Sequence, residues 1–321
     1  MSRDPLPDNR WHELLRLRAT RPHAVADAYA RRQRPGRIVG SRGTLFLVAA
    51  DHPARGALGV PGDPLGMADR RDLLRRLLIA LEHPDVDGLL GSPDVVEELL
   101  LLGALEGKVV IGSMNRGGLY GAGWTMDDRF TGYDAAGIAG CGLEGGKMLL
   151  RIDDDDAGTA RTIEGCANAV TGLAARGLVA MVEPLPYARD GDGALVLQRD
   201  AGSLMRAVTV ASALGATSAY TWLKLPVVPD MTRVMRATTL PTLLLGGDSG
   251  RAPEETYASW GEALALPGVR GLVVGRTLLY PDDDDVDGAI DTAARLVRRD
   301  LPPRGTSPAG TRLSAPANDR A

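Results

Sequence analysis

Eight apolar runs of strand length recur between residues 44 and 299, and each is followed by a stretch with helical spacing. The runs are TLFLVAAD, VDGLLG, KVVIGS, GKMLLRI, LVAMVEP, SAYTWLKL, PTLLLGG and VRGLVVGR. The helical stretches cover residues 69–82, 94–105, 134–140, 159–175, 201–214, 231–236, 254–264 and 286–299. Continuous apolar strands are typical of a parallel sheet that helices cover. Eight strand–helix units over about 250 residues predict an α/β fold, the TIM (β/α)8 barrel.

An open, doubly wound sheet is the alternative architecture, but its first turn normally carries a G-x-G-x-x-G phosphate motif. Here the first turn is DHPARGALG, which lacks that motif. Before the barrel, apolar positions in residues 10–34 have helical spacing that is interrupted at Pro22. We therefore expect an N-terminal helical extension over residues 1–40 and a barrel over 41–300. A tail over 301–321, rich in Pro, Ser, Thr, Gly and Ala, is expected to be disordered.

Charge and composition exclude several classes of partner. The net charge is -4 and no basic block stands out, so we expect neither nucleic acid nor a membrane as a partner. The two cysteines and four histidines lack metal-ligand spacing, so we expect no metal and no other cofactor. The aspartate runs at 153–156 and 282–285 are interpreted as loops before helix N-termini. No apolar run reaches membrane-spanning length, and we expect a cytoplasmic protein.

Lysine is rare in this chain, which makes its positions informative. The 37 basic residues include only three lysines, Lys108, Lys147 and Lys224. Lys224 lies inside the apolar run AYTWLKLP, although lysine is among the residues least often buried. A desolvated lysine has a lowered pKa and becomes a nucleophile toward carbonyl groups, a role that arginine cannot fill. The alternative is a lysine whose head group snorkels from the end of a strand.

Side-chain alternation along the strands brings further ionisable groups toward Lys224. Asp51, Lys147 and Glu183 each lie on the expected inward face of their strands, as does Lys224. In a TIM barrel, such residues at the carboxyl ends of strands form the active site. Two lysines and two carboxylates would perturb each other's pKa values strongly. A buried ion-pair network that only ties strands together is the alternative.

Glycine-rich turns follow the last two strands, where this fold usually binds phosphate. The candidate phosphate and substrate ligands there are Gly246, Gly247, Ser249, Gly275 and Arg276. Two more candidates lie elsewhere: Arg151 shares a strand face with Lys147, and Asn115 begins a glycine-rich segment that ends at Arg129. That segment, which also holds Arg116 and Trp124, is either a lid over the substrate or an inserted surface loop.

Residues 44–299 resemble the Schiff-base-forming class I aldolases of the deoxyribose-phosphate, tagatose-bisphosphate and archaeal fructose-bisphosphate aldolase superfamily. AADHPARG resembles the first-strand Asp-His segment of the archaeal enzymes. GGKMLLRIDDDD, MVEP and LKLP resemble the lysine, glutamate and Schiff-base lysine strands of tagatose-bisphosphate aldolases. In the archaeal enzymes a tyrosine on strand five donates the proton, whereas this chain has Glu183 there.

The whole chain, including MNRGGLYGAGWTMDDRFTGYD, is most similar to an actinobacterial (β/α)8 family often labelled deoxyribose-phosphate aldolase and associated with inositol breakdown. That resemblance implies 6-phospho-5-dehydro-2-deoxygluconate as substrate, cleaved to dihydroxyacetone phosphate and malonate semialdehyde. It also implies a small phosphorylated sugar as the partner of the site. Barrels of this kind often assemble, so we expect a homo-oligomer.

We therefore predict a class I aldolase, a carbon–carbon lyase in which Lys224 forms the Schiff base. Lys147 would hold down its pKa or bind substrate oxygens, and Glu183 or Asp51 would transfer the proton. Two alternatives remain open on the sequence. A sugar-phosphate isomerase or epimerase would keep the phosphate loops without the imine, and a non-catalytic sugar-phosphate-binding barrel would keep the ligand without turnover.

Overall fold

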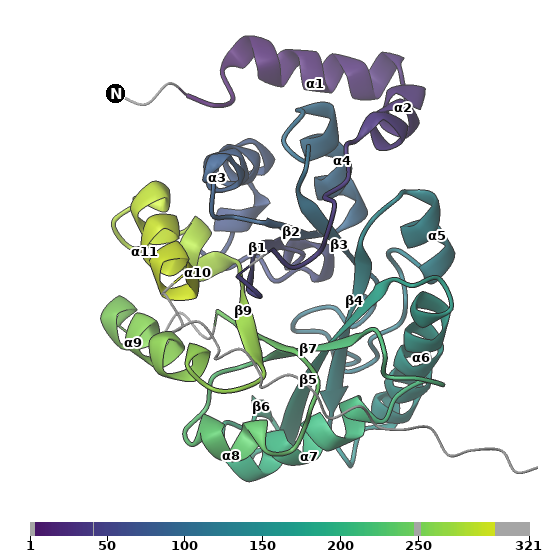
Figure 1. Cartoon of the computed structure of the whole chain (residues 1–321), viewed down its shortest axis with the longest axis vertical. Coiled ribbons are helices and arrows are strands. Elements are labelled where there is room, and N and C mark those ends of the chain that lie inside the picture. Colours follow the sequence, from purple (N-terminus) through teal and green to yellow (C-terminus); the bar gives the residue numbers. More distant parts are fainter. Residues whose placement is uncertain (1–3, 41, 247–251, 299–321) are drawn as a thin grey trace, which may run out of the picture.

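Eight parallel strands close into a barrel in the computed structural model, which describes residues 4–40, 42–246 and 252–298 (Figure 1). Each strand pairs with the next around the barrel, and β1 pairs with β9 to close it. The strands are β1 (Leu45–Ala50), β2 (Gly88–Gly91), β3 (Val109–Ser113), β4 (Gly145–Ile152), β5 (Val179–Arg189), β7 (Thr221–Leu225), β8 (Thr242–Leu245) and β9 (Val269–Val274). The predicted TIM barrel and its eight strands are confirmed.

Helices surround the barrel, and aspartates begin many of them. The side chains of five aspartates accept backbone N–H groups at the starts of α3, α5, α6, α7 and α8, which satisfies donors that a helix cannot pair itself. One of these caps is Asp156, so the first aspartate run does lead into a helix as predicted. The helices are α3 (Arg70–Glu82), α4 (Pro93–Leu101), α5 (Ala135–Gly140), α6 (Ala157–Ala174), α7 (Ala201–Ser212), α8 (Met231–Met235), α9 (Pro253–Leu264), α10 (Arg276–Leu279) and α11 (Val286–Arg298), with short 3-10 turns η1 (Pro53–Arg55) and η2 (Gly66–Ala68).

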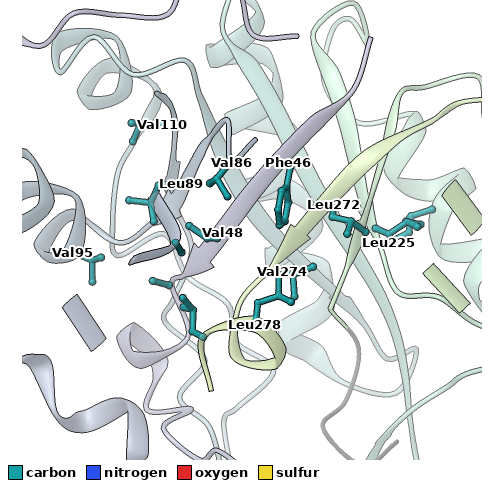
Figure 2. Close-up of a cluster of buried hydrophobic side chains, with 14 of the residues drawn as sticks. Phe46, Val48, Val86, Leu89, Val95, Val110, Leu225, Leu272, Val274 and Leu278 are labelled. Carbon is teal, nitrogen blue, oxygen red and sulfur yellow. The ribbon is translucent and has the colours of Figure 1, made fainter. Parts of the chain in front are cut away.

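Two apolar layers hold these elements together. Outward-facing strand residues pack against the helices, and Figure 2 shows Phe46 and Val48 of β1 beside Leu272 and Val274 of β9 in this layer. Inward-facing residues fill the barrel with a second cluster of Leu45, Leu47, Ala49, Leu90, Val109, Ile111, Val179, Met181, Leu243 and Val273. The predicted inward faces of β1 and β5 are therefore confirmed, and they place an apolar floor beneath the strand ends.

The N-terminal helices α1 (Asp8–Thr20) and α2 (His23–Arg31) lie outside the ring of barrel helices (Figure 1). Leu14 and Ala28 of these helices join the apolar cluster between strands and helices. Polar contacts add to this packing, because Arg10 donates to the carbonyl of Leu102 at 2.5 Å and the Tyr29 and Tyr133 hydroxyls lie 2.6 Å apart. None of the helices in the described ranges combines the length and apolar character that crossing a bilayer requires. The expected tail over 301–321 falls outside the residues that the structure describes.

The connection after β5 differs from the expected loop. β5 continues past the barrel to Arg189 and pairs antiparallel with β6 (Leu195–Leu197), which forms a hairpin. Its turn is stabilised locally, because the carboxylate of Asp190 accepts the N–H groups of Asp192 and Ala194. The sequence gives no apolar alternation here, so only this turn chemistry and the continuation of β5 could have indicated the hairpin.

Candidate active site

Four ionisable side chains from four strands meet inside the barrel. Glu183 of β5 bridges both lysines: one carboxylate oxygen contacts Lys147 of β4, and the other lies 2.9 Å from Nζ of Lys224 on β7. Asp51, directly after β1, lies 3.3 Å from Nζ of Lys147. The structure therefore brings together all four residues that the sequence predicted as catalytic, and it does so at the carboxyl side of the apolar floor.

Burial controls the electrostatics of this cluster. Lys147 is 1% exposed and Lys224 is 3% exposed, so loss of water disfavours the ammonium form and lowers the pKa of both lysines. Burial alone would raise the pKa of Glu183, but the charges of Lys147 and Lys224 outweigh it and hold that pKa below its ordinary value. Glu183 is therefore a carboxylate at neutral pH, and its two lysine partners compete for protons.

A third cation, Arg116, supports the cluster from the segment after β3. Arg116 contacts the carboxylate of Asp51, and its Nε donates to Ser113 Oγ at 2.9 Å. Ser113 in turn donates to Asp51 at 3.1 Å. Burial lowers the pKa of Arg116 to about 10, and its charge is the second largest cause, after burial, of the lowered pKa of Lys147. With three cations and two carboxylates, the cluster becomes electrically neutral when one lysine loses its proton.

The glycine-rich segment is tied to β4 at both ends. The amide of Asn115 donates to the carbonyl of Leu149 at 2.6 Å and accepts its N–H at 2.7 Å. Arg151 binds both carboxylate oxygens of Asp128 at 2.8 Å and also contacts the carbonyl of Thr125. Asn115 and Arg151, which the sequence suggested as substrate ligands, thus use these groups within the fold. Two aromatic residues of the same segment, Tyr120 and Trp124, are exposed.

The predicted phosphate turns are described in part. Gly247 and Ser249 lie outside the described residues, whereas Gly246 follows β8 and Gly275 follows β9. A Cβ atom at Gly275 would lie 2.5 Å from the carbonyl oxygen of Ala49, so this turn requires glycine. Arg276 donates to the carbonyl of Gly59 at 3.2 Å, and its charge contributes, after burial, to lowering the pKa of the adjacent His52.

The segment after β1 carries buried polar atoms that lack a hydrogen-bond partner within the described ranges, which the sequence did not indicate. Oδ1 of Asp51, Nδ1 of His52 and Nε of Arg55 are buried, and none has a hydrogen-bond partner among the described residues. His52 and Arg55 stand in the AADHPARG segment, so their nearness to Asp51 in the sequence is the signal that could have identified them. In the described part of the chain, no group of three or more His, Cys, Asp or Glu side chains is arranged to hold a metal ion.

Comparison with known proteins agrees with this architecture. No curated protein matches the chain. An archaeal fructose 1,6-bisphosphate aldolase is 17% identical with a TM-score of 0.62, over 85% of this chain and 98% of that chain. A Schiff-base-forming fructose-1,6-bisphosphate aldolase is 18% identical with a TM-score of 0.61, over 85% and 99%. At these identities the likeness shows the shared fold.

A more similar structure identifies the family. The crystal structure of Cgl0159 from Corynebacterium glutamicum is 50% identical, with a TM-score of 0.89, and the match covers 92% of this chain and 99% of that chain. Residues 43–294 also match the model of the Cgl0159-like family, which accounts for most of the barrel. The chain therefore belongs to the Cgl0159-like family.

Proposed function

We propose that this protein is a class I aldolase that cleaves or forms a carbon–carbon bond through a Schiff base on Lys224. The observation that carries the proposal is the pair of buried lysines that share the carboxylate of Glu183. Burial lowers the pKa of both lysines and so favours the neutral amine, which is what attack on a ketone requires. The fold shared with Schiff-base-forming fructose-1,6-bisphosphate aldolase supports the same chemistry.

The contacts favour Lys224 over Lys147 as the nucleophile. Lys147 contacts two carboxylates, Glu183 and Asp51, and these hold its amine in place between β1 and β5. Lys224 contacts only Glu183, among the carboxylates of the described residues. The amine with fewer partners is freer to attack, and after burial the charges of Arg116 and Arg55 disfavour a proton on it.

The reaction then needs one base and one electron sink. Lys224 adds to the substrate ketone and loses water to give a protonated imine. Glu183 accepts the proton of the hydroxyl group two carbons from the imine carbon, the carbon–carbon bond breaks toward the imine, and an aldehyde leaves. The remaining enamine takes up a proton at carbon, and water hydrolyses the imine to release the second product. Asp51 is the alternative base.

The substrate that we propose is a phosphorylated sugar or sugar acid, with 6-phospho-5-dehydro-2-deoxygluconate as the specific candidate. Its cleavage would give dihydroxyacetone phosphate and malonate semialdehyde. Gly275 and Arg276 after β9, with Gly246 after β8, would bind the phosphate and hold the ketone near Lys224. The proposal for the phosphate rests on their position at the strand ends.

Borohydride trapping tests the proposal directly. The protein would be incubated with dihydroxyacetone phosphate, reduced, digested and mapped by mass spectrometry. We expect the reduced adduct on Lys224, and an adduct on Lys147 would keep the chemistry but reverse the assignment of the two lysines. The absence of an adduct with both dihydroxyacetone phosphate and the proposed sugar acid would contradict an aldolase. That result would favour a sugar-phosphate isomerase or a binding protein.

A further inference from the structure

Arg55 is a half-buried cation that has no ion-pair partner among the described residues. It ends the short turn η1 after β1, and its buried Nε has no hydrogen-bond partner. No carboxylate of the described residues forms an ion pair with its guanidinium group. Burial lowers the pKa of Arg55, which shows that the charged group is partly deprived of water. An uncompensated charge of this kind costs stability unless a ligand supplies the opposite charge.

The neighbours of Arg55 hold it in place without neutralising it. Its backbone carbonyl accepts the N–H of Tyr120 at 2.8 Å, and its guanidinium carbon lies 5.8 Å from the centre of the Tyr120 ring. Arg151 on β4 is different, because Asp128 binds its guanidinium through both oxygens. Two guanidinium nitrogens of Arg151 thus bind Asp128 within the fold, whereas Nε of Arg55 has no hydrogen-bond partner among the described residues.

The Arg55 guanidinium lies within electrostatic range of residues on β4 and β5. The charges of Arg151 and Glu183 and the side chain of Tyr187 all act on the Arg55 guanidinium, and the charge of Arg55 acts on Lys224. Tyr187 lies on the part of β5 that forms the hairpin with β6, on the same strand face as Glu183. Arg276 is placed differently, since it follows β9 beside His52. Lys224 thus lies within electrostatic range of an arginine on the β4 and β5 side.

We infer that Arg55 forms a second anion subsite, which binds a phosphate or carboxylate group at the end of the substrate remote from the β8 and β9 turns. A guanidinium group binds either anion through two parallel hydrogen bonds. Burial raises the pKa of Tyr187, so its hydroxyl keeps its proton and offers a further donor nearby. The inference rests on the proposed function for the orientation of the substrate, and it narrows the substrate to a chain with an anionic group at each end.

Three probes that cannot form an imine test the subsite on the full chain. They are hexitol 6-phosphate with one anionic group, hexitol 1,6-bisphosphate with a second phosphate, and 6-phosphogluconate with a carboxylate. Calorimetric titration of the wild-type protein should show at least one doubly anionic probe binding about tenfold more tightly than the monophosphate, as a charge-assisted hydrogen bond predicts. Arg55→Gln should lose that difference while its affinity for the monophosphate stays within about twofold. Tighter binding of the bisphosphate would identify the second anion as a phosphate, and tighter binding of 6-phosphogluconate would identify it as a carboxylate.

Matched variants separate this role from general charge and from folding. Arg161→Gln removes an exposed arginine of α6 that pairs with Asp127, and it should bind all three probes as the wild type does. Arg55→Lys keeps the charge without the planar fork and should retain part of the difference. Equal affinity of the wild type for all three probes, or an equal loss for all three in Arg55→Gln, would overturn the subsite. Because no probe has a ketone or aldehyde, a failed borohydride experiment would refute the aldolase and leave this result intact.

Discussion

Two buried ionic clusters lie near β4 and differ in their cations and in the groups that these cations bind. At the amino end of the strand, Glu144 pairs with Arg32, whose guanidinium also donates to the carbonyls of Lys108 at 2.8 Å and Gly142 at 2.7 Å. Glu144 also accepts the N–H of Val110 at 2.8 Å. This cluster joins α2 to the loops beneath the barrel through backbone groups.

The cluster around Lys147, further along β4, is joined almost entirely through side chains. Its cations are lysines with lowered pKa values together with Arg116, and Oδ1 of Asp51 has no hydrogen-bond partner among the described residues. Arginine stays charged, and it suits a permanent link to carbonyl oxygens, whereas a buried lysine can give up its proton. Under the proposed function, the first cluster would serve stability and the second would serve proton and covalent chemistry.

Removing the nucleophile should give the largest effect. Lys224→Arg keeps a positive charge near Glu183 but cannot form an imine, so we expect turnover to fall by roughly 10⁴-fold or more. Aldol cleavage assays and borohydride trapping measure the loss, and the melting temperature checks the fold. The control is Lys108→Arg, because Lys108 donates to the carbonyl of Val86 at the amino end of the barrel. Wild-type trapping by Lys224→Arg would refute the assignment.

Replacing Glu183 by glutamine should lower kcat, whereas the same replacement of Glu144 should not. Glu183→Gln removes the base and the counter-ion of Lys224, and kcat should fall by about 10²- to 10⁴-fold. Glu144→Gln makes the same chemical change in the other cluster, and it should lower the melting temperature while kcat per folded molecule is retained. Steady-state kinetics with thermal melts measure both variants. A normal kcat in Glu183→Gln would transfer the role of base to Asp51.

Breaking the other cluster should be a stability effect. Arg32→Met leaves Glu144 buried without its principal cation, so the free energy of unfolding should fall by about 3–5 kcal/mol. Urea titration measures this loss. Arg34→Met is the matched control, because the Arg34 side chain is 53% exposed and should contribute less than about 1 kcal/mol. If Arg32→Met kept full stability but lost activity, the division between a structural and a chemical cluster would be wrong.

The sequence predicted most of the barrel because each strand is apolar on both faces and is followed by a helix. Alternation then placed Asp51, Lys147 and Glu183 on inward faces, and the structure brings them together. The rarity of lysine was a weaker guide. Lys108 is one of the same three lysines, yet it donates to a backbone carbonyl at the amino end of the barrel and lies outside the candidate site. Position along the strand, rather than rarity, distinguishes it.

The rest of the candidate site comes from segments whose path the sequence pattern does not determine. Arg116 reaches Asp51 because Asn115 and Asp128 tie its segment to β4, which is a tertiary arrangement. Arg55 lies in a short turn with no periodicity. The hairpin that carries Tyr187 depends on contacts in its own turn. The segment of Arg116 is held by polar contacts between residues far apart in sequence, and the hairpin is held by contacts within its turn. Apolar periodicity carries no information about either kind of contact.

The smallest expected effect concerns Arg116, which acts as a positioning residue through the lysines. Its charge lowers the pKa of Lys147 and of Lys224. Without that charge an ammonium ion is easier to form, so both pKa values rise and the neutral amine appears only at higher pH. In Arg116→Gln, the acid side of the pH profile for imine trapping should therefore move up by about one pH unit.

The conservative variant decides whether charge or geometry carries this effect. Arg116→Lys restores a cation beside Asp51, so its acid limb should return toward the wild-type pH even where the rate at the optimum stays lower. If Arg116 served only in packing, both variants would have a lower rate at the optimal pH, and the acid side of their pH profiles would stay at the wild-type pH. Movement of the limb to lower pH in Arg116→Gln would contradict this role, because loss of the direct repulsion and release of the Asp51 carboxylate from its partner both raise the pKa values of the lysines.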